Sequence, residues 1–453
     1  MLLVLLSALL SFQHLHLAIV ILAGSLIAVL ATAHPIAAVG AAAIFVALVP
    51  TYWAPSVPGT IVPLSPAVFA CAALLPAALR LRKEVELHAL DWTVLVLVVC
   101  EAIGYAINTS HGRIGTVALA GLSVALPYAT LRLLGLHPAN RRSFALGIVA
   151  GGVVSAVIAV REYDGWPNPF FKHFPGGAQH DLWARADERF GHLRPEAAFG
   201  HSIALGMFLT LAAVVALGLY WTRRPNGRRS TWALIAIGLL LYALQRTLVR
   251  GPVIMFIVAM IVFALGESRS GRARHAIFVI AAAAILVSFV PLANLAQLRD
   301  ASFTAGRVQA SGDYRIVIWH TVSDRHNFSV FGHQANDPEG AGFAKAVGQS
   351  VGIKSFDDAF AKVYIDFGFF ALIAFALIFV LVARSTVLAD LSAADRAWMA
   401  ALAGCFINLL AVDLITQFGD FFWMTLGIVG AIIQTARVTA AAQQPTVPES
   451  VSA

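Results

Sequence analysis

Three arginines lie where the sequence changes from long apolar runs to polar segments. Arg194, Arg250 and Arg315 each stand at or beside the end of an apolar run. A charge at such a position is costly unless it is paired or solvated in a cavity. Because a planar guanidinium group makes bidentate contacts with phosphate oxygens, this pattern favours a cationic pocket for a diphosphate. The competing interpretation is that each arginine reaches lipid headgroups or pairs with an acid such as Glu196 or Asp358.

A pair of aspartates precedes a segment whose apolar residues recur at helical spacing. One carboxylate of Asp357 and Asp358 is a candidate general base that takes a proton from an acceptor hydroxyl. The alternative is structural, because Ser355 or Asp357 is placed to cap the following helix through its side-chain oxygen. His333 is the rival base, since imidazole titrates near neutral pH.

Three further side chains are weaker candidates for the same site: His201, Arg246 and His320. Each of the two histidines also fits a purely structural position at a membrane interface. The sequence contains no Walker loop, dinucleotide glycine pattern, zinc-ligand spacing or GxSxG motif. We therefore expect neither a metal nor a cofactor, and the sequence argues against ATP-driven and serine-hydrolase chemistry.

The elements that must position these residues are membrane spans. Of the 453 residues, 59% are hydrophobic and 12% are charged, whereas soluble domains carry about 25% charged residues. The composition predicts an all-α, polytopic helical membrane protein. At about 20 residues per span, the apolar runs provide about 12 to 14 transmembrane helices. The formal net charge of +7 fits basic cytoplasmic loops better than nucleic-acid binding.

The spans can be placed one after another along the chain. They are expected at residues 17–33, 36–53, 61–78, 92–107, 114–134, 144–160, 197–221, 232–248, 252–265, 276–292, 369–383, 400–415 and 421–433. The apolar residues 1–12 form either a short span of their own or the beginning of the first one.

The spans divide the chain into four regions. The N-terminal transmembrane helices occupy residues 1–160, a core with the candidate active site residues 161–368, the C-terminal transmembrane helices residues 369–438, and a cytoplasmic tail residues 439–453. The core contains two polar loops, at about residues 161–196 and 294–358. A loop as long as the second is usually either functional or disordered, and the apolar residues interleaved with its charges favour a folded loop.

Arginine clusters in short loops set the orientation. They occur at residues 80–83, 141–142, 223–229 and 269–274. The number of spans between them places all four on one side, which the positive-inside rule makes the cytoplasm. Both long polar loops then face the opposite side, which is the periplasm if the membrane is a bacterial inner membrane.

Taken in order, these residues resemble a family, the lipid-linked glycan ligases and polymerases. It includes O-antigen ligase and the O-antigen and exopolysaccharide polymerases. Arg194 followed by Phe199-Gly-His201 is similar to the family's arginine just before a span. Arg250-Gly251 resembles its Ser-Arg-Gly turn, although Val249 stands in place of the serine.

The large polar loop carries the rest of the resemblance. Arg315 with Trp319 resembles the family's arginine and tryptophan at the start of this loop, and Phe331-Gly332 its glycine motif.

The end of this loop also departs from the family. The stretch from Asp357 to Phe360 resembles its His-Asn-x-Tyr signature, and Asp366-Phe-Gly368 resembles the Glu-x-Gly that follows. The ligases are expected to have histidine at the position of Asp357, so the acidic residue favours a polysaccharide polymerase.

The resemblance implies an inverting, metal-independent glycosyltransferase. Its donor would be a glycan on undecaprenyl diphosphate, with the three arginines Arg194, Arg250 and Arg315 binding the diphosphate. Its acceptor would be another lipid-linked repeat unit, with lipid A–core for a ligase or a protein hydroxyl for an O-oligosaccharyltransferase as alternatives. A polytopic transporter or flippase is the alternative from another class, and it would place its charges near the membrane midplane.

Overall fold

The computed structural model describes residues 15–53, 64–108, 113–171, 188–189, 192–222, 231–268, 328–332, 358–388, 391–410, 414 and 416–442. The predicted span at residues 276–292 and the apolar residues 1–12 lie outside this part of the chain.

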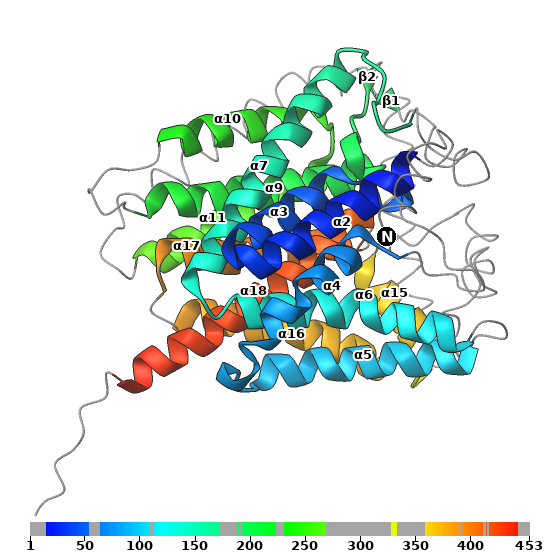
Figure 1. Cartoon of the computed structure of the whole chain (residues 1–453), viewed down its shortest axis with the longest axis vertical. Helices are drawn as coiled ribbons and strands as arrows, with labels where there is room; N and C mark the ends of the chain where they lie inside the picture. Colours follow the sequence, from blue (N-terminus) through cyan, green and yellow to red (C-terminus); the bar gives the residue numbers. More distant parts are fainter. Residues whose placement is uncertain are drawn as a thin grey trace, which may run out of the picture.

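Thirteen α-helices make up most of the described residues. They are α2 (Leu15–Ala33), α3 (Pro35–Leu48), α4 (Pro66–Leu79), α5 (Ala89–Asn108), α6 (Arg113–Leu134), α7 (Pro138–Tyr163), α9 (Ser202–Trp221), α10 (Thr231–Arg246), α11 (Arg250–Ser268), α15 (Ala359–Phe367), α16 (Phe369–Leu388), α17 (Ala393–Leu409) and α18 (Thr416–Ala442). Figure 1 shows them as one bundle in which most helices run across the view, roughly side by side. The predicted all-α class is confirmed.

Short elements connect some of these helices. Three 3-10 helices, η2 (Thr51–Trp53), η3 (Arg82–Glu84) and η5 (Ala197–Phe199), lie between them. The strands β1 (Glu188–Arg189) and β2 (His192–Leu193) pair antiparallel, with Glu188 opposite Leu193. This hairpin is the only sheet in the described ranges.

The helices have the length and composition of membrane spans. Six are long and apolar enough to cross a membrane, and five further apolar helices have 10–17 residues. A helix satisfies its own backbone groups, which a segment in hydrocarbon requires. Large apolar side chains remain exposed on the outside of the bundle, such as Ile235 at 76% and Val29 at 64%. The chain is therefore a helical membrane protein.

Each predicted span in the described residues coincides with a helix, but several boundaries differ. The span expected from residue 197 begins only at Ser202, because Gly200 turns the chain with a φ of 62°. In the other direction, α7 continues to Tyr163, so the polar loop expected from residue 161 begins at Asp164. Similarly, α11 begins at Arg250 rather than at Pro252. Pro252 still lies in the first turn, where its missing N–H is not needed.

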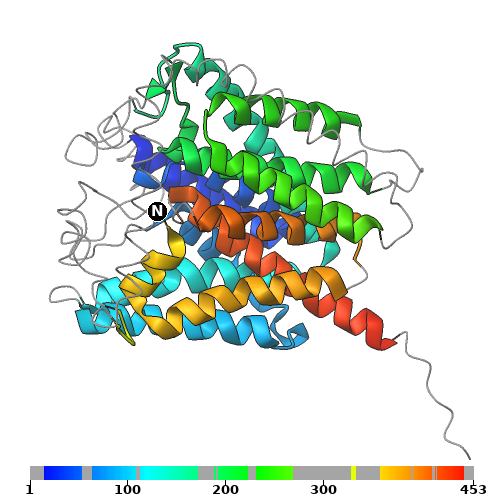
Figure 2. The ribbon, with the colours of Figure 1, turned by 180° about the vertical axis from the view of Figure 1, so that it is seen from behind.

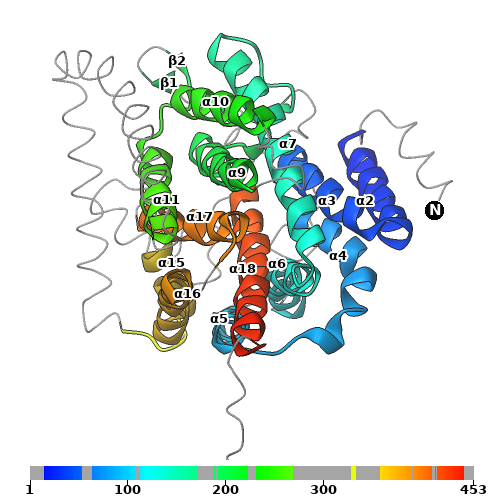
Figure 3. The same ribbon diagram turned by 90° about the vertical axis from the view of Figure 1, so that its left-hand side faces the viewer.

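Helix α9 is at the centre of the bundle. Of the 18-residue apolar stretch of α9 that could span a membrane, 89% of the residues are buried, compared with 39% in α5 and in α6. Helices α7, α10, α11, α17 and α18 all contact it, and Figure 3 shows α9 among them. The polar segment that leads into α9 is therefore held against several helices, because η5 contacts α7, α9, α18 and α3.

Small residues allow the closest helix contacts. A Cβ atom on Gly147 of α7 would collide with the carbonyl oxygen of Gly40 in α3. In the same way, a Cβ atom on Gly404 of α17 would collide with the carbonyl oxygen of Met255 in α11. Small residues at such crossings are typical of helices packed in a membrane, where van der Waals contact replaces the hydrophobic effect.

The two basic clusters within the described residues lie at one end of the bundle, called the basic end below. Arg141 at the start of α7 pairs with Asp395 of α17, with 3.0 Å between Nε and Oδ1. Glu84 of η3 lies 3.8 Å from His137, which precedes α7. The clusters at residues 80–83 and 141–142 therefore lie at the same end, as predicted. The other two clusters lie outside the described residues.

Candidate functional site

The opposite end of the bundle carries the described candidate residues. These are Arg194, His201, Arg246, Arg250 and Asp358; Arg315, His320, His333 and Asp357 lie outside the described residues. Figures 1 and 2 show the β1–β2 hairpin and α15 at this end, away from the last turns of α18.

The segment that leads from Arg194 into α9 is held by a buried acid. Glu162, in the last turn of α7, is only 6% exposed. Its carboxylate accepts hydrogen bonds from the backbone N–H groups of Glu196 at 2.8 Å and Ala197 at 3.1 Å. Ala197 has a φ of 46°, a strained conformation for a residue with a Cβ atom. These two hydrogen bonds, called the Glu162 clamp below, therefore fix a strained turn three residues after Arg194.

His201 has a structural role at the end of this segment. It is the N-cap of α9, and its Nδ1 accepts a hydrogen bond from the backbone N–H of Ile203 at 3.1 Å. An accepting Nδ1 carries no proton, so the imidazole is neutral with its proton on Nε2. This is the structural alternative expected for this histidine.

A second strained turn joins α10 to α11. Leu248 has a φ of 55°, again unusual for a residue with a branched side chain. Arg250 follows as the first residue of α11 and is exposed. Backbone N–H groups at a helix N-terminus attract anions, so the helix and the guanidinium group both favour negative charge here.

Aromatic rings connect the two turns. The guanidinium carbon of Arg246 lies 4.5 Å from the centre of the Tyr163 ring and 4.9 Å from that of Tyr242. The Tyr163 ring stacks on His192, two residues before Arg194, with 4.7 Å between centroids. Arg246 thus acts as a cation held between aromatic faces, and it links the end of α10 to α7 and β2.

Helices α9 and α11 pack together just below these turns. The hydroxyl of Thr210 donates a hydrogen bond to the carbonyl oxygen of Pro252 at 3.0 Å. A Cβ atom on Gly206 would lie 2.8 Å from the Pro252 ring. The structure therefore brings the Arg194 segment and Arg250 to the same end of α9, although more than fifty residues separate them in the sequence.

The sequence analysis missed Asn408 of α17. Its amide oxygen packs on Gly251, beside Arg250, and the residue is 2% exposed. Among the described residues, neither atom of this amide has a hydrogen-bond partner. Buried amides are rarely left unsatisfied, so such a group needs an explanation. The sequence does contain a signal for this residue, because Asn408 is a lone asparagine within an apolar run.

Glu162 and Tyr52 were missed as well. Burial, together with the nearby carboxylates of Glu196 and Glu162, raises the pKa of Tyr52 well above its usual range. The Tyr52 hydroxyl therefore keeps its proton at any physiological pH. Glu162 had a detectable signal, because it is an acid at the end of a span, where charge is costly.

Asp358 caps a helix. It precedes α15, is fully buried, and its Oδ1 accepts hydrogen bonds from the backbone N–H groups of Phe360 at 2.9 Å and Ala361 at 3.0 Å. The sequence analysis expected a cap from Ser355 or Asp357, which both lie outside the described residues. Asp358 itself fills this role through its Oδ1 atom.

Two glycine motifs interlock beside α15. The N–H of Phe369 donates to the carbonyl oxygen of Ser329 at 3.0 Å. Gly332 and Gly368 have φ values of 79° and 89°. A Cβ atom on Gly332 would collide with the carbonyl oxygen of Asp366, and one on Gly368 with that of Val330. Both positions therefore require glycine, and the structure joins the two predicted motifs.

The fold and its apolar surface define the class of protein, a helical membrane protein. Within the described residues, no group of three or more His, Cys, Asp or Glu side chains is placed to hold a metal ion. No known protein family matches the chain, and no characterised protein is significantly similar to it. Any assignment of function therefore rests on the site itself.

Proposed function

We propose that the protein is a membrane glycosyltransferase that moves a glycan from undecaprenyl diphosphate to an acceptor hydroxyl. The reaction proposed is inverting and uses no metal. The acidic Asp357 favours chain polymerisation, as in O-antigen or exopolysaccharide synthesis. Transfer to lipid A–core or to a protein hydroxyl would use the same donor chemistry.

One observation carries this proposal. Two arginine-bearing turns, remote in sequence, lie at the same end of α9, and each contains a non-glycine residue with positive φ, Ala197 and Leu248. Such strain persists only where the surroundings enforce it, and it gathers at functional sites. Here the surroundings include the Glu162 clamp and the Arg246–Tyr163 contact.

The proposed reaction uses these groups as follows. Arg194 and Arg250 bind the diphosphate, and the N-terminus of α11 adds a favourable dipole. A base, Asp357 or His333, takes the proton of the acceptor hydroxyl. The new bond forms at the anomeric carbon as its bond to the diphosphate breaks, and undecaprenyl diphosphate leaves. Cations placed in advance stabilise the charge that develops on this leaving group.

The location of the charges also supports a transferase over a transporter. Arg194 and Arg250 lie at helix ends, where a lipid diphosphate would be reached from the membrane surface. Three acids, Asp91, Glu101 and Asp413, would suggest ion coupling. Asp91 lies in the first turn of α5 and pairs with Arg132 at 3.0 Å. Glu101 lies within α5, and Asp413 lies outside the described residues. We propose that the basic end faces the cytoplasm of a bacterial inner membrane and the site faces the periplasm.

Substitutions at the two arginines test the proposal. Arg250→Lys keeps the charge but loses bidentate geometry, so we expect turnover to fall on the order of 100- to 1000-fold. Arg437→Lys, the same change at the opposite end of the bundle, is the matched control. Polymer length and yield are measured in a deletion strain complemented with each variant, and immunoblots of membranes check insertion. Full activity in both Arg250→Ala and Arg194→Ala would mean that these arginines only anchor headgroups.

A further inference from the structure

An apolar groove opens between α5 and α6 at the basic end of the bundle. It encloses about 290 Å³, and apolar side chains such as Leu95, Val98 and Leu133 form nearly all of its wall. Trp92 and Leu95 on its rim are 56% and 48% exposed. Because α5 and α6 have the composition of membrane spans, this groove faces lipid.

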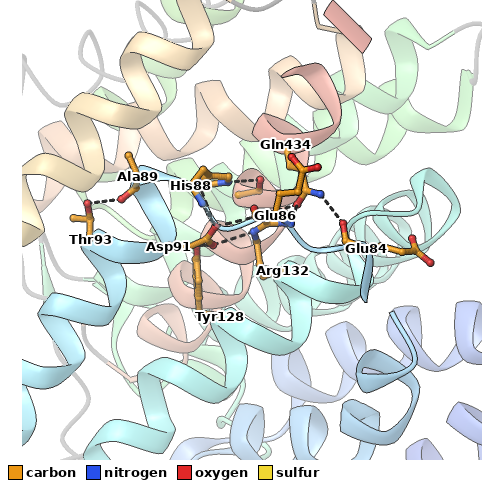
Figure 4. A network of polar contacts seen from close by, with 10 residues as sticks. Glu84, Glu86, His88, Ala89, Asp91, Thr93, Tyr128, Arg132 and Gln434 are labelled. Carbon is orange, nitrogen blue, oxygen red and sulfur yellow. Dashed lines mark hydrogen bonds and ion pairs between the residues drawn. The ribbon is translucent and has the colours of Figure 1, made fainter. Parts of the chain in front are cut away.

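A buried network closes the polar end of the groove. Arg132 donates through Nε to Asp91 at 3.0 Å and through Nη2 to Gln434 of α18 at 2.7 Å. His88 contacts the carbonyl oxygen of Gly430 at 2.9 Å. Figure 4 shows these side chains converging from α5, α6 and α18. Since three helices are tied together there, the groove is preformed.

Basic residues outnumber acids in the segment that enters the groove. The exposed residues Arg80, Arg82 and Lys83 precede Val85, and the exposed acids Glu84 and Glu86 flank it. Arg132 also lines the groove, and its buried Nη1 has no hydrogen-bond partner among the described residues. Basic residues next to a span attract anionic headgroups.

We propose that the groove binds an anionic glycerophospholipid, with one acyl chain between α5 and α6 and the phosphate at Arg80, Arg82 and Lys83. From Asp91 to Val98 the helix rises by about 10 Å, which gives room for an extended stretch of acyl chain. The site lies at the opposite end of the bundle from the candidate active site. It is independent of the proposed glycosyl transfer.

Filling the groove tests the proposal. Ala129 lines it and is exposed, so Ala129→Leu occupies the acyl-chain position without touching the Asp91–Arg132 pair. Gly238→Leu is the matched control, because Gly238 lies on α10 with no heavy atom within 4 Å of an added Cβ atom. Native mass spectrometry of the full-length protein measures bound palmitoyl-oleoyl phosphatidylglycerol, with phosphatidylcholine as the neutral comparison.

We expect the wild type and Gly238→Leu to prefer phosphatidylglycerol. Displacing about two methylene groups of the chain weakens binding about tenfold in Ala129→Leu. An Arg82→Gln/Lys83→Gln variant should lose the preference for phosphatidylglycerol over phosphatidylcholine. Equal binding by Ala129→Leu and Gly238→Leu would overturn the proposal, as would a wild type without this preference. Displacement of phosphatidylglycerol by undecaprenyl phosphate, dependent on Ala129, would also overturn it and assign the groove to a polyprenyl chain.

Discussion

Removing the Glu162 clamp should release the turn that carries Arg194. Glu162 accepts two backbone hydrogen bonds, each worth roughly 1.5–3 kcal/mol when one partner is charged. Against them stands the strain at Ala197, about 1–3 kcal/mol for a residue with this φ. Glu162→Gln keeps one acceptor oxygen. The remaining hydrogen bond then only about offsets the strain at Ala197, so the net stabilisation of the turn falls close to zero. Glu162→Ala removes both bonds and leaves two N–H groups without an acceptor.

Hydrogen exchange and turnover should report this release together. A loss of about 2 kcal/mol raises the open population roughly 30-fold, so the amides of Glu196 and Ala197 should exchange correspondingly faster. In the proposed reaction, polymer yield should fall severalfold in Glu162→Gln and approach that of Arg194→Ala in Glu162→Ala. Glu86→Gln, an exposed acid at the opposite end, is the matched control.

A second substitution tests the strain itself. Ala197→Gly removes the cost of positive φ, so it should restore slow exchange and yield in the Glu162→Gln background. A thiol-reactive dye follows global unfolding, because Cys71, Cys100 and Cys405 are all buried. Two results would refute the idea that the Glu162 clamp offsets the strain at Ala197. One is an unchanged amide exchange rate in Glu162→Ala, and the other is a Glu162→Gln protein whose exchange and yield Ala197→Gly does not restore.

Three further predictions concern the remaining sites. Asp358→Asn keeps a good helix cap and should retain activity, whereas substitution of the true base, Asp357→Asn or His333→Ala, should lower transfer about 100- to 10,000-fold; polymer yield decides between them. Gly332→Ala should lower the melting temperature, because a Cβ atom there collides with the backbone of Asp366; an unchanged melting temperature would contradict the interlocked backbone. Burial lowers the pKa of His88, so the unfolded chain binds the proton more tightly than the folded one. Stability should therefore fall as the pH drops below about 6.5. In a plot of melting temperature against pH, His88→Gln should flatten this part of the curve.

The sequence alone determined the fold class and most of the helices. In hydrocarbon every backbone group must be satisfied within its own segment, so a long apolar run such as residues 202–221 has helix as its only stable form. The same physical constraint makes the positions of the spans predictable. It does not fix their ends, where capping and turn geometry decide, as at Gly200.

Only the tertiary structure decided how the site is built. The Glu162 clamp joins residues 34 positions apart, and the Asn408 amide lies on Gly251 of another helix. Neither contact has a periodic pattern, because each depends on which helices pack together. The sequence could mark Arg194 and Arg250 as costly charges at span ends. Their common location at one end of α9 follows from helix packing, which is a property of the whole bundle.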